Sequence, residues 1–99
     1  LKTLELSDCL IKKLPKEIAF LSKLEVLNVD GDHINELPKE IGSLVSLREL
    51  YIGNNPELTE LPTEIGELLA LEVLDAAHDS LKVLPDALAR LSKLREVNV

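Results

Sequence analysis

Three side chains in the first third of the chain could take part in nucleophilic chemistry: Cys9, Asp32 and His33. A thiol is activated as a nucleophile by a neighbouring base, and that base is oriented by a third group. The stretch Asp30-Gly31-Asp32-His33 also carries oxygen and nitrogen donors of the kind that bind metal ions. Whether either chemistry is available depends on the elements that position these residues.

An internal repeat determines those elements. The pattern Leu-x-x-Leu-x-Leu recurs with spacings of 23, 23, 24 and 23 residues, starting at Leu1, Leu24, Leu47, Leu71 and Leu94. A polar bridge, a Leu-Pro pair, an apolar residue and a further Leu follow in each full copy. Repetition at this scale is typical of solenoid proteins. We therefore divide the 99 residues into repeats 1–23, 24–46, 47–70 and 71–93 and a partial repeat 94–99.

Each repeat begins with a predicted strand. Leu4 and Leu6 alternate with Glu5, and this period of two places both leucines on one face. Strands of successive repeats, stacked about 4.8 Å apart, would pair in parallel and share one core. The fold class is therefore α/β: a leucine-rich solenoid with a curved parallel sheet on its concave face and short helical or 3₁₀ segments on its convex face.

The second half of each repeat predicts the convex segments. Prolines recur at equivalent positions, where they suit the first residue of a short helix: Pro15, Pro38, Pro62 and Pro85. Only about six or seven residues are available, so one or two turns, of 3₁₀ type, are expected. Small residues would let neighbouring turns approach closely: Ala19, Gly42, Gly66 and Ala89.

The residues Leu1-Lys2-Thr3-Leu4-Glu5-Leu6-Ser7-Asp8-Cys9-Leu10-Ile11 and their copies resemble the leucine-rich-repeat family, whose signature is L-x-x-L-x-L-x-x-N/C-x-L. The Leu-Pro half resembles a subgroup found in plant intracellular Ras-group proteins, Ras-pathway scaffolds, Roco proteins, plant immune receptors and bacterial homologues. The resemblance covers all 99 residues. It implies a solenoid that binds partners, and such scaffolds serve many different functions.

The ninth position of each repeat departs from the family pattern. The family carries Asn or Cys there, and an Asn side chain both donates to and accepts from buried backbone groups. Here the column reads Cys9, Asp32, Asn55 and Asp79. An ionised Asp accepts but cannot donate, so we expect a carbonyl group in the affected bends to lose a partner.

This placement argues against both chemistries. Cys9 and Asp32 share an inward column, where a thiol is expected to be structural, and His33 falls in the variable bridge. A calcium loop needs further ligands that end in a bidentate Glu. Asp30 lies in an outward column and Asp32 in an inward one, so the two side chains are expected to point in different directions. We therefore expect no enzyme activity, no metal site and no cofactor.

Composition excludes further classes. No phosphate-binding glycine motif occurs, and a net charge of −7 disfavours nucleic acid as a partner. No apolar run approaches the roughly 20 residues of a membrane helix, and no leader precedes the repeats. One cysteine and no N-x-S/T site favour a cytoplasmic protein, with secretion as the alternative. The chain opens at the first position of one repeat and stops at the sixth position of another, with no recognisable cap. We therefore expect a segment of a longer protein that self-associates through its uncapped ends.

Function is expected on the outward-facing columns of the sheet. These columns hold six of the 18 acidic residues and none of the 11 Lys and Arg residues. Tyr51 is the predicted anchor for a protein or peptide with a basic surface. The candidate binding residues are Glu5, Asn28, Asp30, Glu49, Tyr51, Asn54, Asp75 and His78.

Charges of alternating sign occupy the second column: Lys2, Glu25, Arg48, Glu72 and Arg95. In a parallel stack these side chains would be lateral neighbours, so we expect ion pairs along one rim of the sheet. The only basic cluster, at Lys12, Lys13 and Lys16, is expected on a solvated convex surface.

Two main functional hypotheses remain. The first is a protein-interaction module in signalling or immune recognition. The second is a regulatory repeat segment of a larger multidomain enzyme, such as a Roco-type GTPase or kinase. A structural repeat without a partner is a third alternative, because acidic surfaces are ordinarily just solvated.

Overall fold

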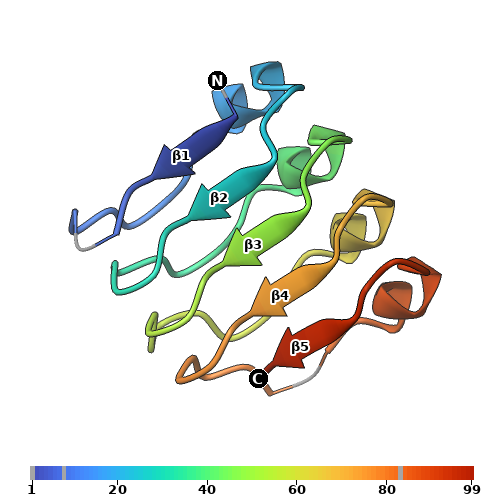
Figure 1. Ribbon diagram of the computed structural model, residues 1–99. Helices are drawn as coiled ribbons and strands as arrows, with labels where there is room; N and C mark the ends of the chain where they lie inside the picture. Colours follow the sequence, from blue (N-terminus) through green and yellow to red (C-terminus); the bar gives the residue numbers. More distant parts are fainter. Residues whose placement is uncertain (1, 8, 83) are drawn as a thin grey trace.

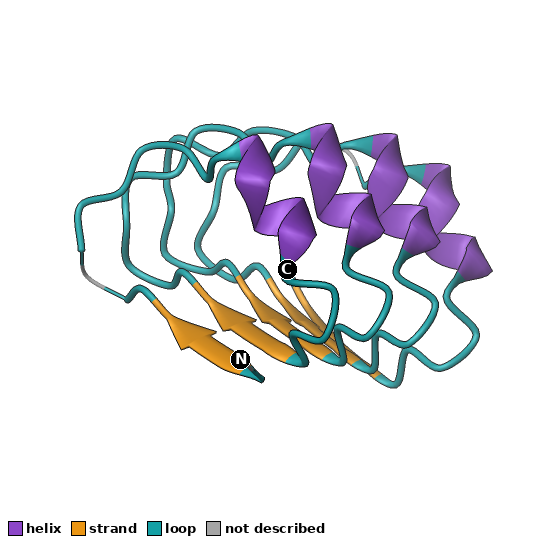
Figure 2. Cartoon of the chain, turned by 90° about the horizontal axis from the view of Figure 1, so that it is seen from above, coloured by secondary structure: helices purple, strands orange, loops and turns teal. Residues whose placement is uncertain are grey.

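A computed structural model of the chain describes residues 2–7, 9–82 and 84–99. In this part of the chain the strands pair in parallel in sequence order (Figure 1). They are β1 (Thr3–Glu5), β2 (Val26–Asn28), β3 (Glu49–Tyr51), β4 (Val73–Asp75) and β5 (Glu96–Asn98). The 3₁₀ helices form a second layer, which faces the sheet across the interior of the solenoid (Figure 2). They are η1 (Lys16–Phe20), η2 (Lys39–Ser43), η3 (Thr63–Glu67) and η4 (Asp86–Arg90).

The strand register follows the repeat without a slip. Leu4 pairs with Leu27, Leu27 with Leu50, Leu50 with Leu74 and Leu74 with Val97. These residues and the apolar residues of the convex half face each other across the interior, and Leu27, Leu50 and Leu74 are completely buried. The predicted curved parallel sheet with 3₁₀ segments on its convex face is confirmed.

The four prolines lie one residue earlier relative to the helices than we predicted. Each is the N-cap, with an extended backbone, as in Pro38 with φ −70° and ψ 150°. Its carbonyl oxygen accepts the first hydrogen bond of the turn, as in the 3.0 Å bond from the Ile41 N–H to Pro38. The residue that follows each proline therefore starts the helix. An acidic residue occupies each first turn, where the helix N-terminus favours negative charge.

Close packing of the convex turns depends on glycine at two positions. A Cβ on Gly42 would lie 2.8 Å from the carbonyl oxygen of Glu64 in η3. A Cβ on Gly66 would lie 2.7 Å from the carbonyl oxygen of Ala87 in η4 and 2.6 Å from its Cβ. Side chains at either position would force neighbouring turns apart, as the small residues in the sequence predicted.

The terminal repeats cover their core residues less well than the central ones. Leu4 and Leu6 in the first repeat are half-buried, whereas Val97 and Val99 in the last are 44% and 66% exposed. The equivalent residues of the central repeats are buried because a repeat covers them on both sides. No helix in the described part of the chain has the length and apolarity to cross a membrane.

Candidate functional site

The strand register gathers most of the predicted binding residues on the outer face of the sheet. Glu5, Asn28, Tyr51, Asp75 and Asn98 form one row, because each pairs with the next across adjacent strands. A second row, two residues earlier, contains Thr3, Val26, Glu49, Val73 and Glu96. The leucine between the two rows faces inward in β1 to β4, so both rows face outward. We call this surface the concave face.

Tyr51 and Glu49 form one unit at the centre of the concave face. The Tyr51 hydroxyl donates a 2.5 Å hydrogen bond to Glu49 Oε1 along the same strand. This bond, together with partial burial, raises the pKa of Tyr51 to about 12, because loss of the proton would leave a phenolate beside a carboxylate. Tyr51 is therefore a neutral aromatic side chain with a fixed orientation, beside an acidic group.

Asp30 and Asn54 lie just beyond the ends of β2 and β3, where side chains fix the turns. Asn54 Nδ2 donates to Asp30 Oδ1 at 2.9 Å. The Asp30 N–H in turn donates to Asn28 Oδ1 at 2.9 Å. Asn54 has a positive φ of 55°, which Asn tolerates better than most residues. These contacts join three of the predicted residues from two repeats into one network.

Three acceptor oxygens converge over Gly53, which the sequence did not single out. A Cβ on Gly53 would lie 3.1 Å from Asp30 Oδ2, 3.4 Å from Asp75 Oδ1 and 2.9 Å from the Ala77 carbonyl oxygen. The only signal in the sequence was a glycine at an outward position flanked by acidic columns. Oxygens in this arrangement suit the ammonium or guanidinium group of a partner.

Other predicted residues lie at the margins. Glu5 is exposed on β1 at one edge of the sheet, three strands from Asp75. His78 is exposed in the turn after β4, with φ 65°. Val73, in the second outward row, is only 8% exposed, so the face is less open at β4. Asp8, one of the six acidic residues counted on this face, lies outside the described residues.

The column at the ninth position of each repeat lies inside the bends, with Asn55 fully buried. Asn55 Oδ1 accepts from the Ile34 N–H at 3.0 Å. Its Nδ2 donates to three carbonyl oxygens, at 3.1 Å to Val29, 2.8 Å to Ile52 and 2.9 Å to Gly53. Asn55 thus satisfies backbone groups in its own repeat and the preceding one.

The aspartates of this column use only one oxygen. Asp32 Oδ1 accepts from the Cys9 N–H at 2.6 Å, and Asp79 Oδ1 accepts from the Asn55 N–H at 2.6 Å. The Oδ2 atoms of Asp32 and Asp79 are buried without a hydrogen-bond partner among the described residues. Aspartate in place of asparagine therefore removes the side-chain N–H donor and leaves one carboxylate oxygen unpaired in each of these two residues.

Cys9 is not the buried structural thiol that we predicted. It is exposed, because side chains of this column reach back to the preceding repeat and the described chain has no repeat before Cys9. Its contact with Asp32 is made by the backbone N–H, and its Sγ lies 3.4 Å from the Ser7 carbonyl oxygen. His33 Nδ1 lies 3.7 Å from Glu57 Oε1 instead. The three residues are not arranged as nucleophile, orienting group and base.

No group of three or more His, Cys, Asp or Glu residues in the described ranges is placed to hold a metal ion. The sequence argument that Asp30 and Asp32 point in different directions agrees with the geometry. Asp30 is half-buried on the concave face, whereas Asp32 is 2% exposed inside the bend.

The alternating charges in the second column form a continuous row of ion pairs. Arg48 lies 3.6 Å from Glu25 and 3.1 Å from Glu72, and Arg95 lies 3.3 Å from the other oxygen of Glu72. The hydrogen bond from Arg48 lowers the pKa of Glu72. Lys2, the first member of the predicted series, makes no ion pair with any described residue.

The basic cluster is solvated, but only part of it lies on the convex side. Lys16 begins η1, whereas Lys12 and Lys13 lie in the bridge between β1 and η1. Lys13 pairs with Glu36 of the next repeat through a backbone bridge and a 3.6 Å ion pair.

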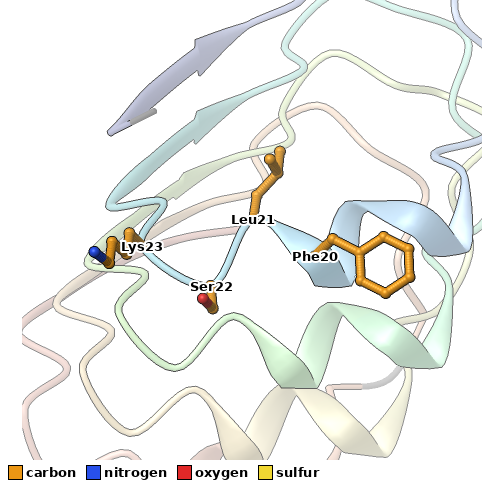
Figure 3. A pocket seen from close by; sticks show the side chains of 4 residues that line it. All are labelled: Phe20, Leu21, Ser22 and Lys23. Carbon is orange, nitrogen blue, oxygen red and sulfur yellow. The ribbon is translucent and has the colours of Figure 1, made fainter.

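A small pocket of about 200 Å³ lies at the end of η1 (Figure 3). Its lining comes from four consecutive residues, Phe20, Leu21, Ser22 and Lys23. The pocket is therefore a local crease within one repeat, and it contains none of the predicted binding residues.

Known proteins show the same repeat. The profile of the family described as "Leucine-rich repeat region" matches residues 1–99. Leucine-rich repeat serine/threonine-protein kinase 1 of Mus musculus is 49% identical over 43 residues, which are 42% of this chain and 2% of the kinase. A solved leucine-rich-repeat protein of Leptospira interrogans has a TM-score of 0.94 and 38% identity, covering 97% of this chain and 24% of that protein.

The plant peptide hormone receptor RGFR1 in complex with RGF2 has a TM-score of 0.60 and 28% identity, over 98% of this chain and 20% of the receptor. This chain thus spans no more than 24% of the length of any of these three proteins. The family profile covers the whole chain, and the parallel strands and 3₁₀ turns recur with the same period. The chain belongs to the leucine-rich-repeat family.

Proposed function

We propose that this chain is a protein-interaction segment that binds a basic protein or peptide on its concave face. The observation that carries this proposal is the alignment of acidic and amide side chains, without Lys or Arg, around Tyr51 in two adjacent rows. The concave surfaces of repeat proteins are commonly used for binding. The similarity to a solved receptor in complex with RGF2 supports a protein or peptide as the partner.

The arrangement suggests how a basic partner would dock. Tyr51 offers an aromatic surface at the centre of the face, where binding energy is usually concentrated. Glu49 lies beside it, and the oxygens of Asp30 and Asp75 over Gly53 offer a position for a cationic side chain. The surrounding acids would speed the encounter with a basic partner more than they would hold it.

A peptide-display selection followed by titration tests this function. We expect selection to enrich Lys and Arg, and Tyr51→Ala to weaken binding of the selected peptide by about 2 kcal/mol or more. Charge reversal at Glu49 and Asp75 should slow association and reduce its salt dependence.

Charge reversal at Lys12 and Lys13, away from the concave face, is the matched control and should change little. Normal binding by the Tyr51, Glu49 and Asp75 variants, together with loss of binding in the lysine variant, would place the binding surface elsewhere.

A second candidate is a regulatory repeat segment of a larger enzyme such as a kinase. It is favoured by the 49% identity over 43 residues to a leucine-rich-repeat protein kinase. In that case the concave face would contact a neighbouring domain of the same protein. The two candidates differ in the coding sequence around these repeats, where a kinase or GTPase domain would show its phosphate-binding motif.

We place the interaction segment in the cytoplasm, in a signalling or immune protein, and assign it no catalysis. The single cysteine and the lack of an N-x-S/T site support this location. Detection of the tagged full-length protein in a secreted fraction would contradict it.

A further inference from the structure

Asp79 presents a half-buried carboxyl group in which Oδ2 is buried and only Oδ1 has a hydrogen-bond partner among the described residues. Its Oδ1 accepts from the Asn55 N–H at 2.6 Å, whereas its Oδ2 has no partner among the described residues. An ionised carboxylate without a donor on one oxygen is costly inside a protein. The fourth repeat nevertheless places this group at the same position as Asn55 in the third.

Asn55 shows what this position requires. Its Oδ1 accepts from a backbone N–H of the preceding repeat, and its Nδ2 donates to the carbonyl oxygens of Val29, Ile52 and Gly53. One repeat later, the equivalent residues are Ile52, Ala76 and Ala77. By this equivalence, the carbonyl groups of these three residues are the acceptors that a donor on Asp79 would serve, and a carboxylate offers them none. The Oδ1 contact itself differs, because Asp79 accepts from the Asn55 N–H, whereas the Leu58 N–H, the equivalent of that of Ile34, donates to the Asn55 carbonyl oxygen.

A proton on Oδ2 resolves this conflict. A neutral carboxylic acid keeps one acceptor oxygen and gains one O–H donor, which is the pattern of an Asn side chain with one fewer hydrogen. We propose that Asp79 is a proton-binding site that tightens the bend of the fourth repeat when it takes up a proton from solvent, acting in place of the missing asparagine.

Burial and the neighbouring carboxylates favour the protonated form of Asp79. Burial raises the pKa of Asp79 to about 6, against the lowering effect of the Asn55 N–H bond. The carboxylates of Asp30 and Asp75 raise this pKa further, and His78 lowers it. Asp30 belongs to the second repeat, and Asp75 and His78 precede Asp79 in the fourth, so acidic residues of two different repeats act on this proton.

The direction of the pH effect follows from linkage. The folded chain binds this proton more tightly than the unfolded chain, whose ordinary Asp pKa is 3.8. The stabilisation is therefore complete below pH 3.8 and is lost as the pH rises through about 6. Asp79 is only half-buried, and water screens part of the effect. Without screening, these pKa values would change the unfolding equilibrium constant about tenfold between pH 7.5 and pH 5, so with screening we expect about a three- to fivefold change through this residue.

Urea unfolding of Asp79→Asn at pH 7.5 and pH 5 tests the proposal, with Asp86→Asn as the matched control. Asp86 is an exposed acid in the same repeat, so its variant removes the same charge without touching the bend. The amide supplies the donor at every pH. Asp79→Asn should therefore be at least as stable as the wild type at pH 7.5, and should lose the roughly three- to fivefold pH response that Asp86→Asn retains.

A carbon NMR titration of the Asp79 carboxyl in the wild-type chain gives a second readout that needs no variant. A midpoint near pH 6 supports the proposal. A midpoint near the ordinary value of 3.8 overturns it. A pH response of Asp79→Asn as steep as that of Asp86→Asn also overturns it.

Discussion

Asn55 and the two aspartates of its column show how much a single atom matters inside a repeat. Asp32, Asn55 and Asp79 occupy the same position in three bends, and only the amide of Asn55 can both accept and donate hydrogen bonds. In Asn55 each polar atom of the side chain is used, whereas Asp32 and Asp79 leave one oxygen unpaired. The stability of each bend therefore depends on whether its ninth residue can supply a donor.

We expect Asn55→Ala to lower the free energy of unfolding by about 1–3 kcal/mol, because it leaves buried carbonyl groups and the Ile34 N–H without partners. Urea melts measure this loss. Asn35→Ala, at an exposed position of the neighbouring bridge, is the control and should stay within about 0.5 kcal/mol of the wild type. Equal losses in the two variants would mean that Asn55 does not hold the bend.

At the residue scale, the sequence predicted which residues occupy the ninth-position column, but not to which repeat their side chains bond. It identified the column of Cys9 and Asp32, and it predicted that an aspartate would leave a bend short of a donor. It did not reveal that each side chain reaches back to the preceding repeat, which is why Cys9 is exposed. That direction depends on the backbone path of the bend, and residue spacing alone does not specify it.

The elements of this protein are short, and packing between them determines where they lie. Each 3₁₀ helix has five residues, too few to be stable alone. The repeat therefore predicts the existence of strands and turns well, because neighbouring copies supply the packing. Exact boundaries were less predictable: Pro38 ends an extended segment and does not begin the helix, since its ψ of 150° is not helical.

Gly66→Ala tests how closely the convex turns must pack. The added Cβ would lie 2.7 Å from a backbone oxygen of η4, so η3 and η4 must move apart, at a cost of about 1–3 kcal/mol. Thermal or urea unfolding measures the change. Ser43→Ala, at an exposed site of η2, should be nearly neutral. Unchanged stability in Gly66→Ala would show that the turns can separate freely.

At the scale of the whole molecule, the sheet has two outer strands. In the described chain β1 pairs only with β2, and β5 only with β4, so each keeps one unpaired edge. Unpaired edges beside exposed apolar residues favour association. The predicted concave face lies between these edges, and the sequence located it because the register of a parallel stack follows directly from the repeat.

We expect the isolated 99-residue chain to self-associate as its concentration rises, which light scattering would detect. Val97→Lys should reduce association, because it places a charge on the open edge. Val45→Lys is the control, since Val45 is also exposed but lies in the turn after η2, outside the strands. A monomer at every concentration, or an equal effect of the two variants, would contradict association through the edges.

The row of ion pairs along Glu25, Arg48, Glu72 and Arg95 has a consequence for assembly of the sheet. Repeats with the same apolar pattern give a folding chain few means of distinguishing its neighbours, and β2 could pair with β4 if the third repeat were left out. Omission of the third repeat would place Glu25 beside Glu72, and omission of the fourth would place Arg48 beside Arg95, whereas the observed order pairs opposite charges at each step. The alternating signs therefore disfavour any strand pairing that leaves out one repeat, because such a pairing brings like charges together.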